Sequence, residues 1–148
     1  MVYDYEYNKS TLIMATKGTI ESEKFNILFH KYDNHKTYLL PCVGLADIIE
    51  DGSQKQLEEY LSKNLEKYKN KVQNVVLGCT HYPLIKNEIQ DVLGNVRFFE
   101  GSYRLAIHLK NLLKESNMLE NREGKILFID SNNSREKEKR FYNIIERM

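Results

Sequence analysis

A short segment of the chain brings together side chains that can do chemistry. Gly78-Cys79-Thr80-His81 follows the apolar run Val75 to Leu77 and precedes Pro83. A thiol with an imidazole two residues away can exchange protons or attack an electrophile. The segment therefore indicates acid-base or nucleophilic chemistry at Cys79, with a small buried cysteine beside a surface histidine as the structural alternative.

We expect this segment to lie where a parallel strand ends and a helix begins. In open α/β sheets, ligands bind outside the carboxyl ends of the strands. Backbone N–H groups and the positive end of a helix dipole favour anions there, including a thiolate. Thr16 and Thr19 also follow an apolar run, so they are expected at a strand exit, where the alternative is ordinary N-cap and turn chemistry.

The elements that would position these residues follow one another in alternation. Short apolar runs typical of buried strands alternate with stretches of helical period. This order predicts an α/β fold, a three-layer sandwich with a mainly parallel sheet and right-handed crossovers. The predicted strands are 11–15, 37–43, 72–77, 96–99 and 125–129, and the predicted helices are 20–30 with Ser22 as N-cap, 45–50, 54–68, 83–92 with a stop at Gly94, 105–113 and 134–146.

Length and charge narrow the class of protein. The 148 residues suit one medium domain, or one domain and a fragment of another. With 22 Lys and Arg against 21 Asp and Glu, the net charge of +1 provides no basic field, so we expect no nucleic-acid partner. The sequence has no apolar run of the ~18 residues that cross a bilayer and no signal-peptide pattern at its start. We expect a cytoplasmic protein without a membrane partner.

Neither a metal nor a cofactor is expected. Cys42 and Cys79 are read as reduced thiols, because no secretory signal accompanies them. His30, His35 and His108 have no cysteine or histidine at ligand spacing, which argues against zinc. Glycine-rich phosphate motifs are missing from the sequence.

The string Val-Val-Leu-Gly-Cys-Thr-His-Tyr-Pro-Leu, residues 75–84, strongly resembles the second active-site motif of glutamate racemases, in the cofactor-independent aspartate/glutamate racemase superfamily. Segments 15–22, 45–52 and 128–131 are similar to three further family segments in the same order. The resemblance implies an α/β racemase-like C-terminal domain over residues 1–98. Residues 99–148 would be a C-terminal strand and helices that complete the other domain in the family.

The resemblance also implies roles for individual residues. Cys79 would be the acid/base on one face of the substrate, and His81 would tune it. Glu50 would orient His81, with a solvated acid at a helix end as its alternative. Thr80, Thr16 and Thr19 would bind the substrate, glutamate.

The family reaction interconverts L- and D-glutamate with two thiols and supplies D-glutamate for peptidoglycan. The family's first catalytic cysteine lies in an N-terminal half whose motifs do not occur in this sequence, and Cys42, in a predicted strand, is expected to be structural. One thiol cannot both remove and return the proton, so we expect the chain to be inactive alone. A separate N-terminal racemase half is one expected partner, and a homo-oligomer is another.

Two other functions remain open from the sequence. Cys79 and His81 could serve as nucleophile and base in acyl or thiol transfer. The chain could also be a non-catalytic remnant or a binding domain.

Overall fold

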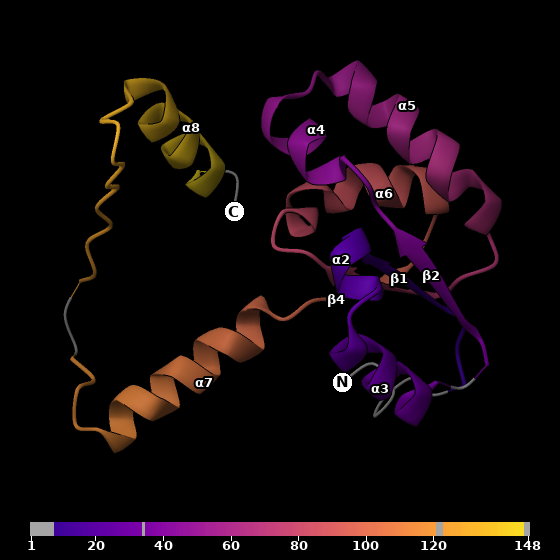
Figure 1. Ribbon diagram of the computed structural model, residues 1–148, viewed down its shortest axis with the longest axis horizontal. Helices are drawn as coiled ribbons and strands as arrows, with labels where there is room; N and C mark the ends of the chain where they lie inside the picture. The colour runs from indigo at the N-terminus through magenta and orange to yellow at the C-terminus, as the bar shows by residue number, and fades with distance from the viewer. Residues whose placement is uncertain (1–7, 34, 121–122, 147–148) are drawn as a thin grey trace. The chain divides into compact units, whose positions relative to one another are not determined.

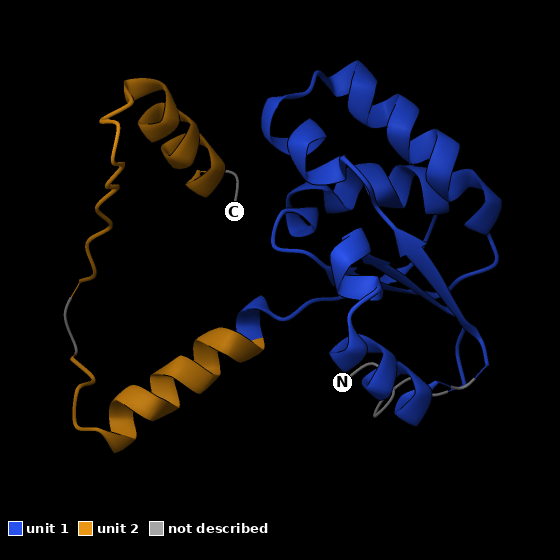
Figure 2. Ribbon diagram, in the orientation of Figure 1, with its two compact units in different colours: residues 1–103 blue, residues 104–148 orange. Residues whose placement is uncertain are grey.

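The computed structural model describes residues 8–33, 35–120 and 123–146. The chain divides into two compact units, residues 1–103 and residues 104–148 (Figure 2). The sequence-based boundary after residue 98 is a different division, because it separates the segments by the domain they would belong to in a two-domain racemase. That boundary stays a prediction. Among the described residues, no helix is long and apolar enough to cross a membrane.

Unit 1 is built on a four-stranded, wholly parallel sheet with the order β2-β1-β3-β4 (Figure 1). Strand β1 is Thr11–Ala15, β2 is Thr37–Pro41, β3 is Asn74–Gly78 and β4 is Arg97–Phe99. All five residues of β1 are buried, as their continuous apolar run predicts for a central strand. The predicted α/β fold with its parallel sheet is confirmed.

Helices cover both faces of this sheet. Helices α5 (Gln54–Leu65) and α6 (Lys86–Leu93) lie on one side, and α3 (Glu23–Tyr32) lies on the other (Figure 1). The main core forms between the strands and α5 and α6, because each contributes apolar side chains at the period of its own structure. Its members include Leu12, Met14, Leu57, Leu61, Leu65, Val75, Leu77, Ile89 and Leu93.

Side chains set several helix starts. Ser22 caps α3 as predicted, its hydroxyl accepting from the Phe25 N–H at 3.2 Å. The predicted helix 20–30 corresponds to α3, but Ile20 belongs to a separate short helix, α2 (Lys17–Ile20), which ends before Ser22. Helix α4 (Leu45–Asp51) begins after Gly44, whose φ of 75° suits glycine. Helix α5 begins with a capping box at Ser53 and continues into the 3₁₀ turn η1 (Glu66–Tyr68).

Two predicted boundaries near the candidate site shift. Strand β2 ends at Pro41 rather than at residue 43, because the chain turns there and the Val43 N–H donates to the Pro41 carbonyl. Pro83 lies in a 3₁₀ turn, η2 (Tyr82–Ile85), and α6 begins only at Lys86. The helix then ends at Gly94, as predicted.

Unit 2 contains most of helix α7 (Ser102–Glu115) and helix α8 (Arg135–Ile145). The predicted strand 125–129 is wrong, since these residues form no strand and lie outside the described sheet. A strand needs a neighbour for its N–H and C=O groups, and the apolar run alone does not provide one. Instead, the Phe128 ring packs against Phe141 of α8, with 5.0 Å between ring centroids.

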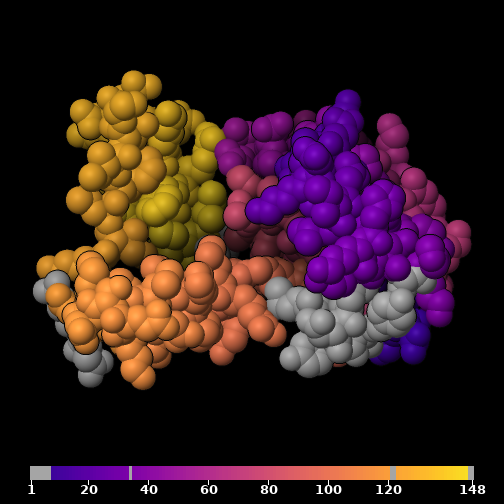
Figure 3. Space-filling view, turned by 60° about the horizontal axis from the view of Figure 1, so that its bottom comes forward, coloured from indigo at the N-terminus to yellow at the C-terminus, as the bar shows by residue number. Residues whose placement is uncertain are grey.

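Unit 2 exposes much apolar surface. None of its described residues is buried. Leu105, Leu109 and Leu112 share one face of α7 and are 69%, 55% and 46% exposed, and the side chains of this helix form an elongated surface (orange in Figure 3). Such a continuous apolar face is typical of a surface that another protein segment covers.

Candidate active site

The candidate site begins where two neighbouring strands end. Ala15 at the end of β1 pairs with Gly78 at the end of β3, so Thr16 and Cys79 leave the sheet from adjacent positions. Gly78 makes this approach possible, because a Cβ at this position would lie 2.9 Å from the Ala15 Cβ and 3.0 Å from the Met14 carbonyl oxygen. Both segments lie at strand exits, as predicted, and the structure shows that these exits are adjacent and need a glycine at position 78.

Cys79, His81 and Glu50 form a continuous relay. The Cys79 Sγ lies 3.6 Å from Nδ1 of His81. The Nε2 of the same ring lies 2.5 Å from Oε1 of Glu50, which is carried by α4. Because an ionised carboxylate only accepts hydrogen bonds, Nε2 donates to Glu50 and leaves the Nδ1 lone pair facing the thiol. The imidazole is thus oriented to take a proton from Cys79.

The three side chains of the relay are partly exposed to solvent. Cys79 is half-buried against the core, whereas the side chains of His81 and Glu50 are 29% and 39% exposed. A small molecule can reach such a thiol, and water can exchange protons with the imidazole. Glu50 contacts His81 from the last turn of α4 while its side chain stays 39% exposed, and its role in orienting His81 remains a prediction.

The three threonines differ in what they contact. Thr16 accepts from the Thr19 N–H at 3.2 Å, and the two hydroxyls lie 2.8 Å apart. This is N-cap geometry at the start of α2. The hydrogen bond between the two hydroxyls lies on the protein surface. Thr80 is exposed between Cys79 and His81. The substrate-binding roles of these residues remain predictions.

Cys42 is placed differently from Cys79. Its side chain is 3% exposed, and its Sγ donates to the Leu40 carbonyl at 3.4 Å. Burial raises the pKa of the Cys42 thiol to about 12, which keeps it protonated at neutral pH. The thiol lies one residue beyond β2 rather than within it, and its burial fits the predicted structural role.

Tyr82 supports the site, and the sequence reasoning gave it no role. It is fully buried, its hydroxyl donates to the Cys42 carbonyl at 3.4 Å, and its N–H donates to the Cys79 carbonyl at 3.2 Å. Burial raises the pKa of Tyr82, so its hydroxyl stays a neutral donor. Tyr82 thereby fixes the relay loop to the segment that leads into α4 and Glu50. A large aromatic residue directly after the reactive loop is the signal that could have indicated it.

The predicted helix N-terminus beside Cys79 is corrected by the structure. The residues that follow the relay form the 3₁₀ turn η2, and the first α-helical residue is Lys86. The dipole of an α-helix therefore does not begin at Cys79. The ionisable group next to the thiol is His81, so His81 is the group that can accept the proton of Cys79.

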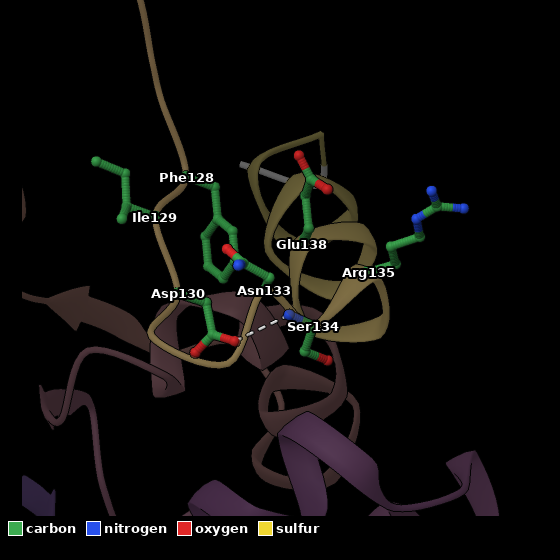
Figure 4. Close-up of a pocket in the computed structure, with 7 residues that line it drawn as sticks. All are labelled: Phe128, Ile129, Asp130, Asn133, Ser134, Arg135 and Glu138. Carbon is green, nitrogen blue, oxygen red and sulfur yellow. Dashed lines mark hydrogen bonds between the residues drawn. The ribbon is translucent and has the colours of Figure 1, made fainter.

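Other parts of the described chain offer fewer groups for catalysis. Among the described residues, no three His, Cys, Asp or Glu side chains are grouped to hold a metal ion. A pocket of about 390 Å³ in unit 2 lies at the start of α8 (Figure 4). Its Asp130 accepts from the Ser134 N–H at 3.1 Å and from Lys137 at 3.3 Å, so this carboxylate stabilises the helix start. The pocket contains none of the predicted site residues.

Sequence comparisons place these features among known proteins. No protein-family model matches the chain. A glutamate racemase of Clostridium botulinum (strain Alaska E43) is 39% identical over 138 residues, which are 87% of this chain and 54% of that protein. The chain therefore spans about half the length of the curated relatives it matches.

Solved structures agree with the sequence matches. The glutamate racemase of Francisella tularensis in complex with D-glutamate aligns with a TM-score of 0.63 and 32% identity, over 78% of this chain and 46% of that one. The Escherichia coli glutamate racemase, in complex with L-glutamate and the activator UDP-MurNAc-Ala, aligns with a TM-score of 0.61 and 26% identity, over 70% and 42%.

Proposed function

We propose that this chain supplies one of the two thiols of a glutamate racemase, because it is homologous to about half of such an enzyme. The reaction would be cofactor-independent interconversion of L- and D-glutamate, in the cytoplasm, with D-glutamate used for peptidoglycan. The observation that carries the proposal is the relay from Glu50 through His81 to Cys79.

The relay gives each residue a role. Cys79 exchanges the α-proton on one face of glutamate, and His81 holds or returns the proton of the thiol through Nδ1. Glu50 keeps the imidazole in the tautomer that leaves Nδ1 free to accept. Thr80, Thr16 and Thr19 are proposed to bind the carboxylates or the amine of the substrate from the same edge of the sheet.

The second thiol has to come from another polypeptide segment. The chain has two cysteines. Cys42 is buried with its pKa raised to about 12 by that burial, so it is a poor proton-transfer group at neutral pH. A base on one face can only return the proton to the face from which it was removed. We therefore propose that a separate racemase half places a thiol opposite Cys79.

The experiment compares the chain alone with the chain plus the complementary part of the Clostridium botulinum racemase, the part that this chain does not match. Each sample is incubated with L-glutamate, and D-glutamate is measured by chiral chromatography. We expect D-glutamate from the pair and none from the chain alone. D-Glutamate from the chain alone at an enzyme-like rate would overturn the two-segment proposal, and no product from a pair shown to associate would overturn the racemase role.

A further inference from the structure

The orientation of His81 supports a second kind of reaction at Cys79. One ring nitrogen lies 3.6 Å from the thiol sulfur and the other lies 2.5 Å from the Glu50 carboxylate. A nucleophile within reach of a base, with the base oriented by a third group, is the arrangement that activates a thiol for covalent catalysis. We propose that Cys79 is a nucleophile toward activated carboxylic esters, with His81 as its base and Glu50 as the orienting group.

The reaction would proceed by transfer of the acyl group to sulfur. The Cys79 S–H proton moves to Nδ1 of His81, and the thiolate attacks the ester carbonyl carbon. The C–O bond to the alcohol breaks, the alcohol oxygen takes the proton from the imidazolium, and a thioester remains on Cys79. A water molecule then gives a proton to Nδ1 of His81, and its oxygen attacks the thioester carbonyl carbon. The C–S bond breaks, the sulfur takes the proton back from the imidazolium, and the carboxylic acid and the free thiol are formed. The sum is ester plus water to acid plus alcohol, with no oxidant or reductant.

The surroundings of the relay favour this chemistry. Cys79 is half-buried, so its thiolate would be partly desolvated and still accessible, and His81 is exposed enough to meet water. Cys42 and Tyr60, in the core next to Cys79, add no negative charge at neutral pH, because burial raises the pKa of each side chain to about 12. Tyr82 holds the backbone of the loop by its hydrogen bonds to the Cys42 and Cys79 carbonyls, so the backbone that carries Cys79 and His81 is anchored to the core.

The inference does not depend on the proposed racemase activity, since it needs neither glutamate nor a second thiol. The test uses the 148-residue chain and p-nitrophenyl acetate near pH 7, with nitrophenolate release followed by absorbance and the acyl adduct by intact mass. We expect many turnovers per chain and an acetyl group on Cys79. Cys79→Ala should remove the turnover, and Glu50→Gln should lower the rate at least about tenfold, as for loss of an oriented general base.

Control variants separate this activity from background catalysis by thiols and imidazoles. His108→Gln and Cys42→Ala should retain the rate of the unchanged chain, and thermal melts should confirm that each variant folds. Turnover that is unaffected by Cys79→Ala, a rate that is unaffected by Glu50→Gln in a folded variant, or a single release without turnover would each overturn the proposal. The racemase proposal is judged separately, by D-glutamate formation.

Discussion

His81 and Glu50 are 31 positions apart in the sequence, yet the ring Nε2 of His81 lies 2.5 Å from the Glu50 carboxylate. Packing beneath the two side chains explains the contact. Leu45 at the start of α4 and Tyr82 at the start of η2 are both fully buried, so the elements that carry Glu50 and His81 are held by one core. The contact between Glu50 and His81 is therefore a consequence of the fold rather than of local sequence.

The first prediction is that Cys79 reacts with iodoacetamide much faster than Cys42 near pH 7. Cys79 is half-buried and faces His81, whereas Cys42 is 3% exposed and its pKa is raised to about 12 by burial. Peptide mass mapping over time measures both rates in one sample. Equal rates in the folded protein would contradict the placement of the two thiols, and unfolding in urea should abolish the difference.

The second prediction concerns the close approach of strands β1 and β3. Gly78→Ala should destabilise the protein by about 1–3 kcal/mol, as overpacking does, because its Cβ would lie 2.9 Å from the Ala15 Cβ. Gly18→Ala is the matched control, since its Cβ would meet nothing within 4 Å. Urea unfolding measures both. Equal free energies of unfolding for the two variants would contradict the described register.

The third prediction is a dependence of stability on pH through Glu100. Partial burial alone would raise the pKa of Glu100, but hydrogen bonds from Ser102 and Lys86 and the charge of Lys86 hold it below its usual value. Because the folded pKa is the lower one, the stabilisation is present above the unfolded value of 4.5 and is lost as pH falls through the folded value.

Glu100→Gln should therefore lower the free energy of unfolding near pH 7 by about 0.5 kcal/mol, the scale of a partly exposed pair. The difference from the unchanged chain should shrink as pH falls through the folded pKa of Glu100 and disappear once the carboxyl is protonated in both states. Glu115→Gln, at an exposed position of α7, is the control and should show no such dependence. A constant difference between pH 3 and 7 would show that the Glu100 charge does not stabilise the fold.

The fourth prediction is that the isolated chain self-associates. The apolar face of α7 is exposed, and so are Ile126, Leu127 and Ile129, at 61%, 78% and 82%. Burying such surface between copies is favourable by roughly 25 cal/mol per Å². Light scattering at micromolar concentration should give a dimer or larger species, and Leu105→Glu with Leu109→Glu should reduce its mass. A monodisperse monomer of the unchanged chain would contradict the prediction.

Much of unit 1 was predictable from the sequence because its signals are local. The apolar runs of β1 and β3, the Ser22 N-cap and the stop at Gly94 each act through neighbouring residues. The contact between Cys79 and His81 was also predictable from local sequence, since the two residues are two positions apart. The pairing of Glu50 with His81 was inferred only from the racemase resemblance.

Other features depend on contacts that a local pattern does not contain. The run 125–129 has strand composition but no partner strand in the described sheet, so it stays irregular. Pro83 fits the start of either an α-helix or a 3₁₀ turn, and the bond from the Leu84 N–H to the His81 carbonyl, three residues back, belongs to the tighter turn. The hydroxyl of Tyr82 finds its acceptor 40 positions away, at Cys42.

The most direct measurement is D-glutamate formation by three versions of the pair with the complementary racemase part: the unchanged chain, Cys79→Ala and Cys42→Ala. Proton exchange on one face at Cys79 predicts product from the unchanged and Cys42→Ala pairs. The Cys79→Ala pair should form no D-glutamate, although it should still associate in size-exclusion chromatography. D-Glutamate formed by the Cys79→Ala pair at the rate of the unchanged pair would contradict the assignment of Cys79.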